Sequence, residues 1–286
     1  MPVEDLRWPA QAGSTIRPVA GPGSDAPALA FRLWRCRVCP ADPLSLRPAL
    51  GTKEQVLFVT AGRGRLQLDA GTAELSPLHA HRLPDGAAGV LVCDAPPPLE
   101  LLYFASPHAA PGAAPGTVDV AALAGNRFPA RRWGRSITNG SSPLAAAGFT
   151  AGLSILAPMG GQVPWHEHPD RQGEVYVLLG GRPQVCIGSW VDEVDTPAAA
   201  IIGGDQWHQV TNLHPGEPLS LIYCYEGSVA APHWWQERDG VLPAAGTGAS
   251  PPLPAGAFPQ CTSTKPTAWL ELAAAHLEAS ARQQRP

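Results

Sequence analysis

Three histidines and one glutamate in the second half of the chain have the types and the spacing of metal ligands. His166 and His168 stand in the segment 161–168, Gly-Gln-Val-Pro-Trp-His-Glu-His, where Pro164 disfavours a helix. In an extended strand, side chains at positions i and i+2 point to the same face. Both imidazoles are therefore predicted to point into the interior of one β-structure.

Glu174 and His208 come from two further segments. Glu174 begins the apolar run 174–181, and a hairpin would bring its carboxylate beside the imidazoles. His208 lies in 203–212, which has the composition of a turn followed by a strand. Three imidazoles and one carboxylate suit Fe(II), Mn(II), Zn(II), Ni(II) or Cu(II), and suit Ca²⁺ or Mg²⁺ poorly. We predict one divalent transition metal as the cofactor, bound by His166, His168, Glu174 and His208.

The elements that must position these residues belong to a repeat. The runs 55–63 and 174–182 lie 119 residues apart, and both are apolar and end in a Gly-Arg turn. The runs 98–103 and 218–223 match with a shift of one residue. Each half is therefore predicted to contain short strands in the same order, and about 100 residues suffice for a small antiparallel sandwich or barrel.

The composition limits the classes of partner. Hydrophobic residues make up 44% of the 286 residues, and 33 Pro and 30 Gly are dispersed among apolar runs, as turns between short strands require. Charged residues make up 15% and the net charge is −4, without the basic patch of a nucleic-acid-binding protein. No apolar run approaches the roughly 18 residues that span a membrane. We expect neither nucleic acid nor a membrane as a partner.

The six cysteines are too few for a disulfide scaffold, and the acidic N-terminus lacks the apolar run of a signal peptide. Both features predict a cytoplasmic location. Cys36 and Cys39 have the spacing of half a zinc site or of a redox pair. No second such pair is present, and this spacing puts the two thiols on opposite faces of a strand. We interpret them as unconnected thiols.

The site residues resemble the two sequence motifs of the cupin superfamily. Residues matching the first motif, a Gly, a His-x-His, a Glu and a Gly, are Gly161, His166, His168, Glu174 and Gly180. Residues matching the end of the second motif are His208 and Asn212. The resemblance implies a jelly-roll barrel with the metal inside, and it extends to the first half through the repeat.

Two alternatives stay open at this point. Five residues separate His168 from Glu174, where the family usually has a shorter spacing, so Asp170 or Gln172 could replace Glu174. One alternative to the metal site is that His166 and His168 are a solvated pair and His208 is an unrelated core residue. Another is that the three histidines bind metal only weakly. Trp165, Tyr176 and Trp207 flank the predicted ligands and could line a pocket or fill the core.

The first half keeps the repeat and loses the ligands. At the same offset, the four ligand positions fall on Arg47, Ala49, Gln55 and Gly89. His79 and His81 form another His-x-His pair, but they precede the Pro-x-Gly of 84–86, where the family has no ligands. We predict a metal-free first barrel and interpret both histidines as non-ligands.

The predicted fold is all-β, with two jelly-roll cupin barrels in tandem and a short C-terminal helix. Residues 1–126 form the degenerate first barrel and a connection, 127–240 the metal-binding barrel, and 241–286 a Pro/Ala/Gly linker followed by the helix at 267–282. This helix is expected to pack on a barrel or on a neighbouring subunit, so a homodimer fits the sequence.

The substrate is expected to be a small organic molecule bound at the metal. With Fe(II), the analogy to the family favours a dioxygenase. With Zn, Mn or Ni, the metal would be the Lewis acid of an isomerase, epimerase, lyase or cyclase, and Glu174 would be the catalytic base. A non-catalytic sensor of small molecules is the third hypothesis, although the sequence contains no DNA-binding helix pair.

Overall fold

The computed structural model describes residues 3–5, 7, 13–20, 29–48, 51–108, 114–123, 126–128, 132–138, 142–168, 172–204, 206–227 and 236–237. The linker and helix expected in 241–286 lie outside these residues. Within these ranges, no helix has the length and apolar character needed to cross a membrane. None of the five cysteines in them, Cys36 and Cys39 included, forms a disulfide.

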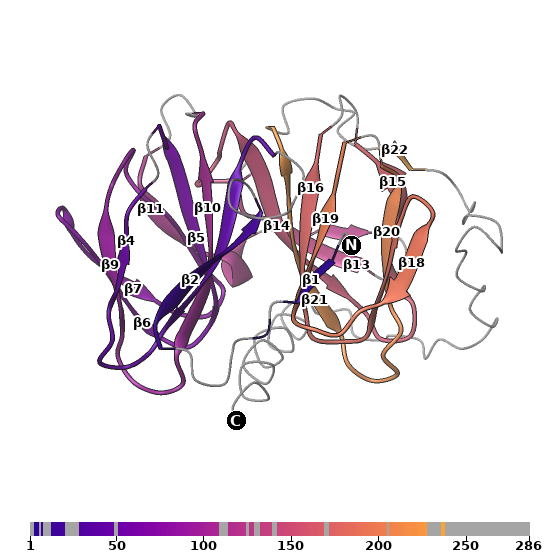
Figure 1. The fold of residues 1–286 in the computed structure, drawn as a ribbon, viewed down its shortest axis with the longest axis horizontal. Helices are drawn as coiled ribbons and strands as arrows, with labels where there is room; N and C mark the ends of the chain where they lie inside the picture. Colours follow the sequence, from indigo (N-terminus) through magenta and orange to yellow (C-terminus); the bar gives the residue numbers. More distant parts are fainter. Residues whose placement is uncertain are drawn as a thin grey trace.

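The described chain folds into two antiparallel β-barrels that lie side by side (Figure 1). The strands of the first barrel are β2 (Thr15–Ala20), β3 (Arg32–Val38), β4 (Leu44–Leu46), β5 (Glu54–Ala61), β6 (Gly64–Leu68), β7 (Gly71–Leu75), β8 (His79–Arg82), β9 (Gly89–Cys93), β10 (Leu99–Ser106) and β11 (Gly116–Asp119). They form a six-stranded sheet in the order β11-β8-β5-β10-β3-β2 and a four-stranded sheet in the order β4-β9-β6-β7.

The second barrel repeats this plan. Its strands are β12 (Asn126–Phe128), β13 (Arg132–Ser136), β14 (Phe149–Leu156), β15 (Gly161–Glu167), β16 (Glu174–Leu179), β17 (Pro183–Ile187), β18 (Trp190–Glu193), β19 (Ala198–Ile202), β20 (His208–Asn212), β21 (Leu219–Glu226) and β22 (Gln236–Glu237). With β1 (Val3–Asp5), they form sheets in the orders β1-β19-β16-β21-β14-β13-β12 and β18-β17-β20-β15-β22. The predicted all-β fold of two jelly-roll barrels is confirmed.

The N-terminal strand crosses to the second barrel. β1 pairs antiparallel with β19, from Val3 opposite Ala200 to Asp5 opposite Ala198. It takes the place beside β19 that β11 takes beside β8 in the first barrel. The domain division expected from the sequence, with 1–126 in the first barrel, therefore differs from the structure at residues 3–5.

The two large sheets pack face to face and form the core between the barrels. Because side chains alternate along a strand, Val175, Val177 and Leu179 of β16 face this core, while Tyr176 and Leu178 face the interior of the second barrel. Aromatic rings from both barrels meet in it, among them Phe104 and Phe149, whose ring centroids are 5.8 Å apart. The sheet that carries Glu174 is therefore buried on both faces.

A buried carboxylate joins the two barrels. Glu54, at the start of β5, accepts hydrogen bonds from the backbone N–H groups of Ala147 and Gly148, at distances of 2.8 to 3.0 Å. Arg82 Nη2 lies 3.4 Å from the same carboxylate. A Cβ atom at Gly148 would lie 1.8 Å from Ser106 Oγ, so only glycine permits this close approach.

We predict that Glu54→Gln lowers the free energy of unfolding by about 3 kcal/mol, because it leaves Arg82 buried without its carboxylate. Urea denaturation followed by tryptophan fluorescence measures the loss. Glu74→Gln, on the exposed side of β7, is the matched control and should change stability by less than about 0.5 kcal/mol. Equal stability of the two variants would contradict the role given to Glu54.

Candidate metal centre

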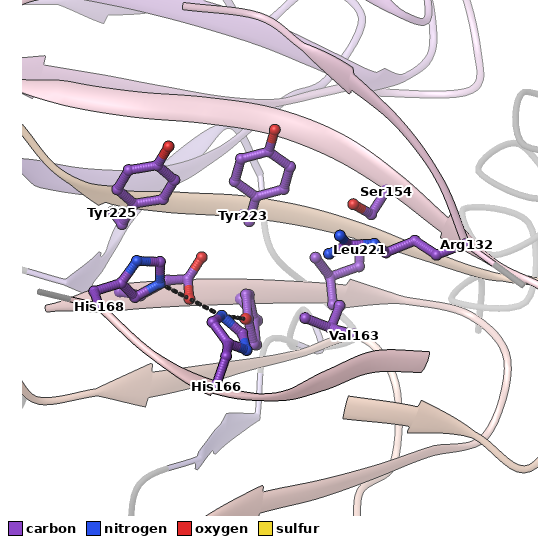
Figure 2. A pocket seen from close by; sticks show the side chains of 10 residues that line it. Arg132, Ser154, Val163, His166, His168, Leu221, Tyr223 and Tyr225 are labelled. Carbon is purple, nitrogen blue, oxygen red and sulfur yellow. Dashed lines mark hydrogen bonds and ion pairs between the residues drawn. The ribbon is translucent and has the colours of Figure 1, made fainter. Parts of the chain in front are cut away.

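The structure brings the four predicted ligands together inside the second barrel. Their coordinating atoms all lie within 4.8 Å of one another, and all four side chains are buried. They come from three places in the fold: the end of β15, the start of β16 and the start of β20. Figure 2 shows His166 and His168 pointing into the same pocket. Asp170 lies outside the described residues, and Gln172 is not among the residues that line the pocket beside this group.

An irregularity in β15 aims His166 inward. Val163 pairs with Val210, but His166 pairs with His208, so β15 has one more residue than β20 between these two pairs. Such a bulge re-aims the side chains that follow it, and proline is tolerated there. Val163 and His166 consequently line the same cavity although they are three residues apart.

Backbone carbonyls fix the ring orientation of two histidines. His166 Nδ1 lies 2.8 Å from the carbonyl oxygen of Pro164, and His208 Nδ1 lies 2.8 Å from that of Gln206. A carbonyl oxygen only accepts, so each Nδ1 must carry the proton. In the neutral rings, the Nε2 atoms that face the site then present lone pairs.

Acceptor atoms therefore converge at one point. Glu174 Oε2 lies 2.8 Å from His208 Nε2, 2.9 Å from His168 Nε2 and 4.0 Å from His166 Nε2. At 2.8 Å, a carboxylate oxygen and an unprotonated Nε2 repel each other unless a positive charge lies with them. Two ligands at right angles, each about 2.1 Å from an ion, are about 3 Å apart. The donor types and separations thus fit a divalent transition metal.

Electrostatics keep the carboxylate ionised. Burial by itself would raise the pKa of Glu174, but in the metal-free protein a protonated imidazole at His168 or His208 outweighs burial through its charge and hydrogen bond and holds the pKa well below its ordinary value. Burial, and secondly the charge of a protonated His208, lowers the pKa of His166 well below its ordinary value. The group is therefore built to present an anionic oxygen and a neutral imidazole.

Asn212, the last residue of the second motif, has a structural role. It is fully buried, and its amide nitrogen donates to the carbonyl oxygens of Leu156, Ala157 and Glu217 at 2.8 to 3.2 Å. Its side-chain oxygen accepts from the backbone N–H groups of Arg182 and His214. Asn212 thereby connects these backbone segments by hydrogen bonds and is not one of the four candidate ligands.

A small cavity is lined by three of the four residues, His166, His168 and Glu174. Its volume is about 30 Å³, and the other side chains that line it are Arg132, Ser154, Val163, Tyr176, Leu221, Tyr223 and Tyr225. Tyr176 is thus a lining residue, whereas Trp165 and Trp207 are not and stack on each other at 6.2 Å. Tyr225 stacks on His168 with ring centroids 4.8 Å apart.

Arg132, Ser154 and Tyr225 were not predicted from the sequence. Alternation along β21 places Tyr223 and Tyr225 on one face of the strand, and both line the cavity, but no local pattern tells that this face points inward. Nothing local in the sequence marks Arg132 or Ser154 as facing the site.

The first barrel fills the corresponding position with a neutral amide. Gln55 occupies the place of Glu174; it accepts the Tyr103 hydroxyl at 2.6 Å and donates to the carbonyl oxygens of Pro84 and Ala87 at 3.2 Å. Leu46 lies opposite Gly89 as His166 lies opposite His208. The expected match of His166 with Arg47 is therefore wrong by one residue, because a fixed offset ignores the bulge in β15.

His79 and His81 belong to no group of three or more candidate ligands within the described residues. His81 is 2% exposed, and its Nδ1 lies 2.8 Å from Thr117 Oγ1. Burial, and secondly the charge of His79, lowers the pKa of His81 to about 4. His81 is therefore a buried neutral histidine at neutral pH.

Comparison with known proteins gives the fold. No family model matches the chain, and no curated protein matches its sequence. A glyoxylate-induced protein from Pseudomonas aeruginosa has a similar structure, with a TM-score of 0.62 and 15% identity over 75% of this chain and 80% of that one. Oxalate decarboxylase from Lactobacillus farciminis, in a formate complex, matches with a TM-score of 0.61 and 14% identity over 79% of this chain and 84% of that one. A cupin 2 conserved barrel domain protein from Leptotrichia buccalis matches with a TM-score of 0.52 and 8% identity over 77% of this chain and 92% of that one. The chain thus has the cupin fold.

We predict that His166→Ala or His208→Ala abolishes stoichiometric metal binding, because each removes a buried Nε2 donor. Elemental analysis of protein purified with added metal salts measures the content. His79→Ala is the matched control and should keep the wild-type content. Loss of metal in the His79 variant alone would place the site in the first barrel.

We predict a pH-dependent contribution of His81 to stability. Its pKa is lower in the folded chain, so the unfolded chain takes up the proton first as the pH falls. The contribution is complete above pH 6.5 and is lost as the pH falls toward 4, by about 2 kcal/mol between pH 7 and pH 5. Urea denaturation of metal-free protein should show a smaller loss over this range for His81→Gln than for wild type. His214→Gln, on a partly exposed histidine, should behave as wild type.

Proposed function

We propose that the second barrel binds one divalent transition metal on His166, His168, Glu174 and His208, and that this centre catalyses a reaction of a small organic molecule. The observation that carries the proposal is the convergence of lone pairs on one point. Two imidazoles have their only proton committed to a carbonyl oxygen, and an ionised carboxylate stands 2.8 Å from one of them. A buried cluster of this kind needs a positive charge, and a divalent metal ion would supply it with all three imidazoles neutral.

The surroundings favour catalysis over a purely structural ion. An ion that takes five or six ligands would keep open positions beside these four, and the adjoining cavity is lined by three of them, His166, His168 and Glu174. Hydroxyl groups stand at its walls; the Tyr176 hydroxyl lies 3.5 Å from His166 Nε2. The side chains of this chain would bind, orient and shield a substrate, because the cavity is lined by buried groups.

The first candidate reaction is an oxidation with Fe(II), in a dioxygenase. The second is Lewis-acid chemistry with Zn, Mn or Ni, in an isomerase, epimerase, lyase or cyclase. When bound, the metal would supply either oxygen activation or carbonyl polarisation. The likeness to oxalate decarboxylase, a carbon–carbon lyase by its name, favours the second candidate over the non-catalytic sensor.

The metal content and oxygen consumption of the purified protein distinguish these reactions. Iron, with oxygen uptake in the presence of small phenols, diketones or thiols, would support the dioxygenase. Zinc, manganese or nickel without uptake would support Lewis-acid chemistry. Tight binding of a small molecule without turnover would support the sensor. The proposal would be contradicted if the protein held less than about 0.1 metal ion per chain after incubation with each metal salt.

We predict that Glu174→Gln loses most of its metal together with its activity, because the carboxylate is the only anionic donor of the four. Elemental analysis and an activity assay on one preparation measure both quantities. Metal retained at the wild-type level with turnover lost would instead assign Glu174 the role of a base. Glu193→Gln, which removes an exposed partner of Arg182, is the control and should change neither.

A further inference from the structure

A buried arginine stands at the end of the cavity away from the histidines. Arg132, the first residue of β13, is 5% exposed and lines the same cavity as His166, His168 and Glu174. Figure 2 shows its guanidinium group reaching from β13 toward the middle of the pocket. Arg132 pairs with Leu156, whose side chain belongs to the interior core of this barrel.

Two phenols line the cavity together with Arg132. Tyr176 and Tyr223 are both lining residues. The Tyr176 hydroxyl lies 3.5 Å from His166 Nε2, so it connects the cavity with the ligand cluster.

The lining residues have an excess of positive charge once a metal is present. Glu174 is the one acidic side chain in the lining, and Arg132 is the one arginine or lysine. A divalent ion together with these two side chains gives a net charge of about two positive units. Placing like charges among buried side chains is unfavourable, and an anion between them offsets the cost.

Size and shape restrict the anion. A volume of about 30 Å³ holds roughly two water-sized groups, so the molecule has few non-hydrogen atoms. The apolar side chains of Val163 and Leu221 form part of the wall, and Ser154 offers a hydroxyl group. A guanidinium fork matches the planar geometry of a carboxylate and can bind it with two parallel hydrogen bonds.

We propose that this cavity selects a small carboxylate, bound between the metal position and the guanidinium group of Arg132. This inference rests on the proposed function and specifies the substrate class of that site. In this arrangement Arg132 is a specificity-determining residue. Its charge orients the carboxylate and disfavours uncharged molecules, while the walls of the cavity exclude larger molecules.

Carboxylate binding to the Co(II)-loaded protein tests the inference. Acetate and formate should change the visible Co(II) spectrum, and acetamide, a neutral molecule of the same shape as acetate, should bind at least about 10-fold more weakly. In Arg132→Gln the acetate affinity should fall at least about 10-fold while the cobalt content is unchanged. Arg132→Lys keeps the charge without the fork and should fall between these values.

Arg135→Gln is the matched control. Arg135 lies on the same strand and is 8% exposed, but it pairs with Leu153, which belongs to the core between the barrels. Its substitution should leave acetate binding unchanged. Near-ultraviolet circular dichroism checks that each variant keeps the wild-type fold, and the lysine variant decides the matter if the glutamine variant does not fold.

Two results would overturn the inference: equal affinity for acetate and acetamide, or equal acetate affinity in wild type and Arg132→Gln. Failure of wild type to bind Co(II) would instead contradict the proposed function. In that case, thermal stabilisation of the metal-free protein by acetate is compared between wild type and Arg132→Gln. Stabilisation that depends on Arg132 would keep the carboxylate site, and its absence would reject the site.

Discussion

The site depends on proton positions that the backbone dictates. Two carbonyl oxygens, from Pro164 and Gln206, each take the only N–H of a neutral imidazole. The nitrogen atoms left facing inward must then share their space with an ionised carboxylate, in a place that water does not screen. The rigid packing of the surrounding strands offsets the cost of holding these acceptor atoms so close together. The sheet of β16 is held on one side by the barrel interior and on the other by the core between the barrels.

Much of this could be predicted from the sequence, because local rules govern it. The alternation of side chains places His166 and His168 on one face, and the repeat gives the strand order of both barrels. Glu174 does lie beside them, but the expected hairpin is wrong: β15 pairs with β20 in one sheet, whereas β16 pairs with β19 and β21 in the other. The structure also brings this carboxylate into the group despite the long preceding loop.

Other features depend on contacts between segments that are distant in the chain. Arg132 precedes its partners in the cavity by at least 22 residues, and no local pattern tells which face of β13 it occupies. The bulge at Pro164 shifts one strand by a residue relative to the repeat, which a constant offset cannot represent. The pairing of β1 with β19 joins segments almost 200 residues apart, and periodicity carries no information on such pairing.

The pairing of β1 with β19 also decides how the molecule can be divided. β19 lies next to β16, the strand that begins with Glu174, and β1 covers its outer edge. A fragment starting near residue 127 would lack β1, and the backbone groups of β19 that bond to it would be open to another chain. The second barrel therefore takes one of its strands from residues 3–5, and this pairing can form only after residues 198–202 have been synthesised.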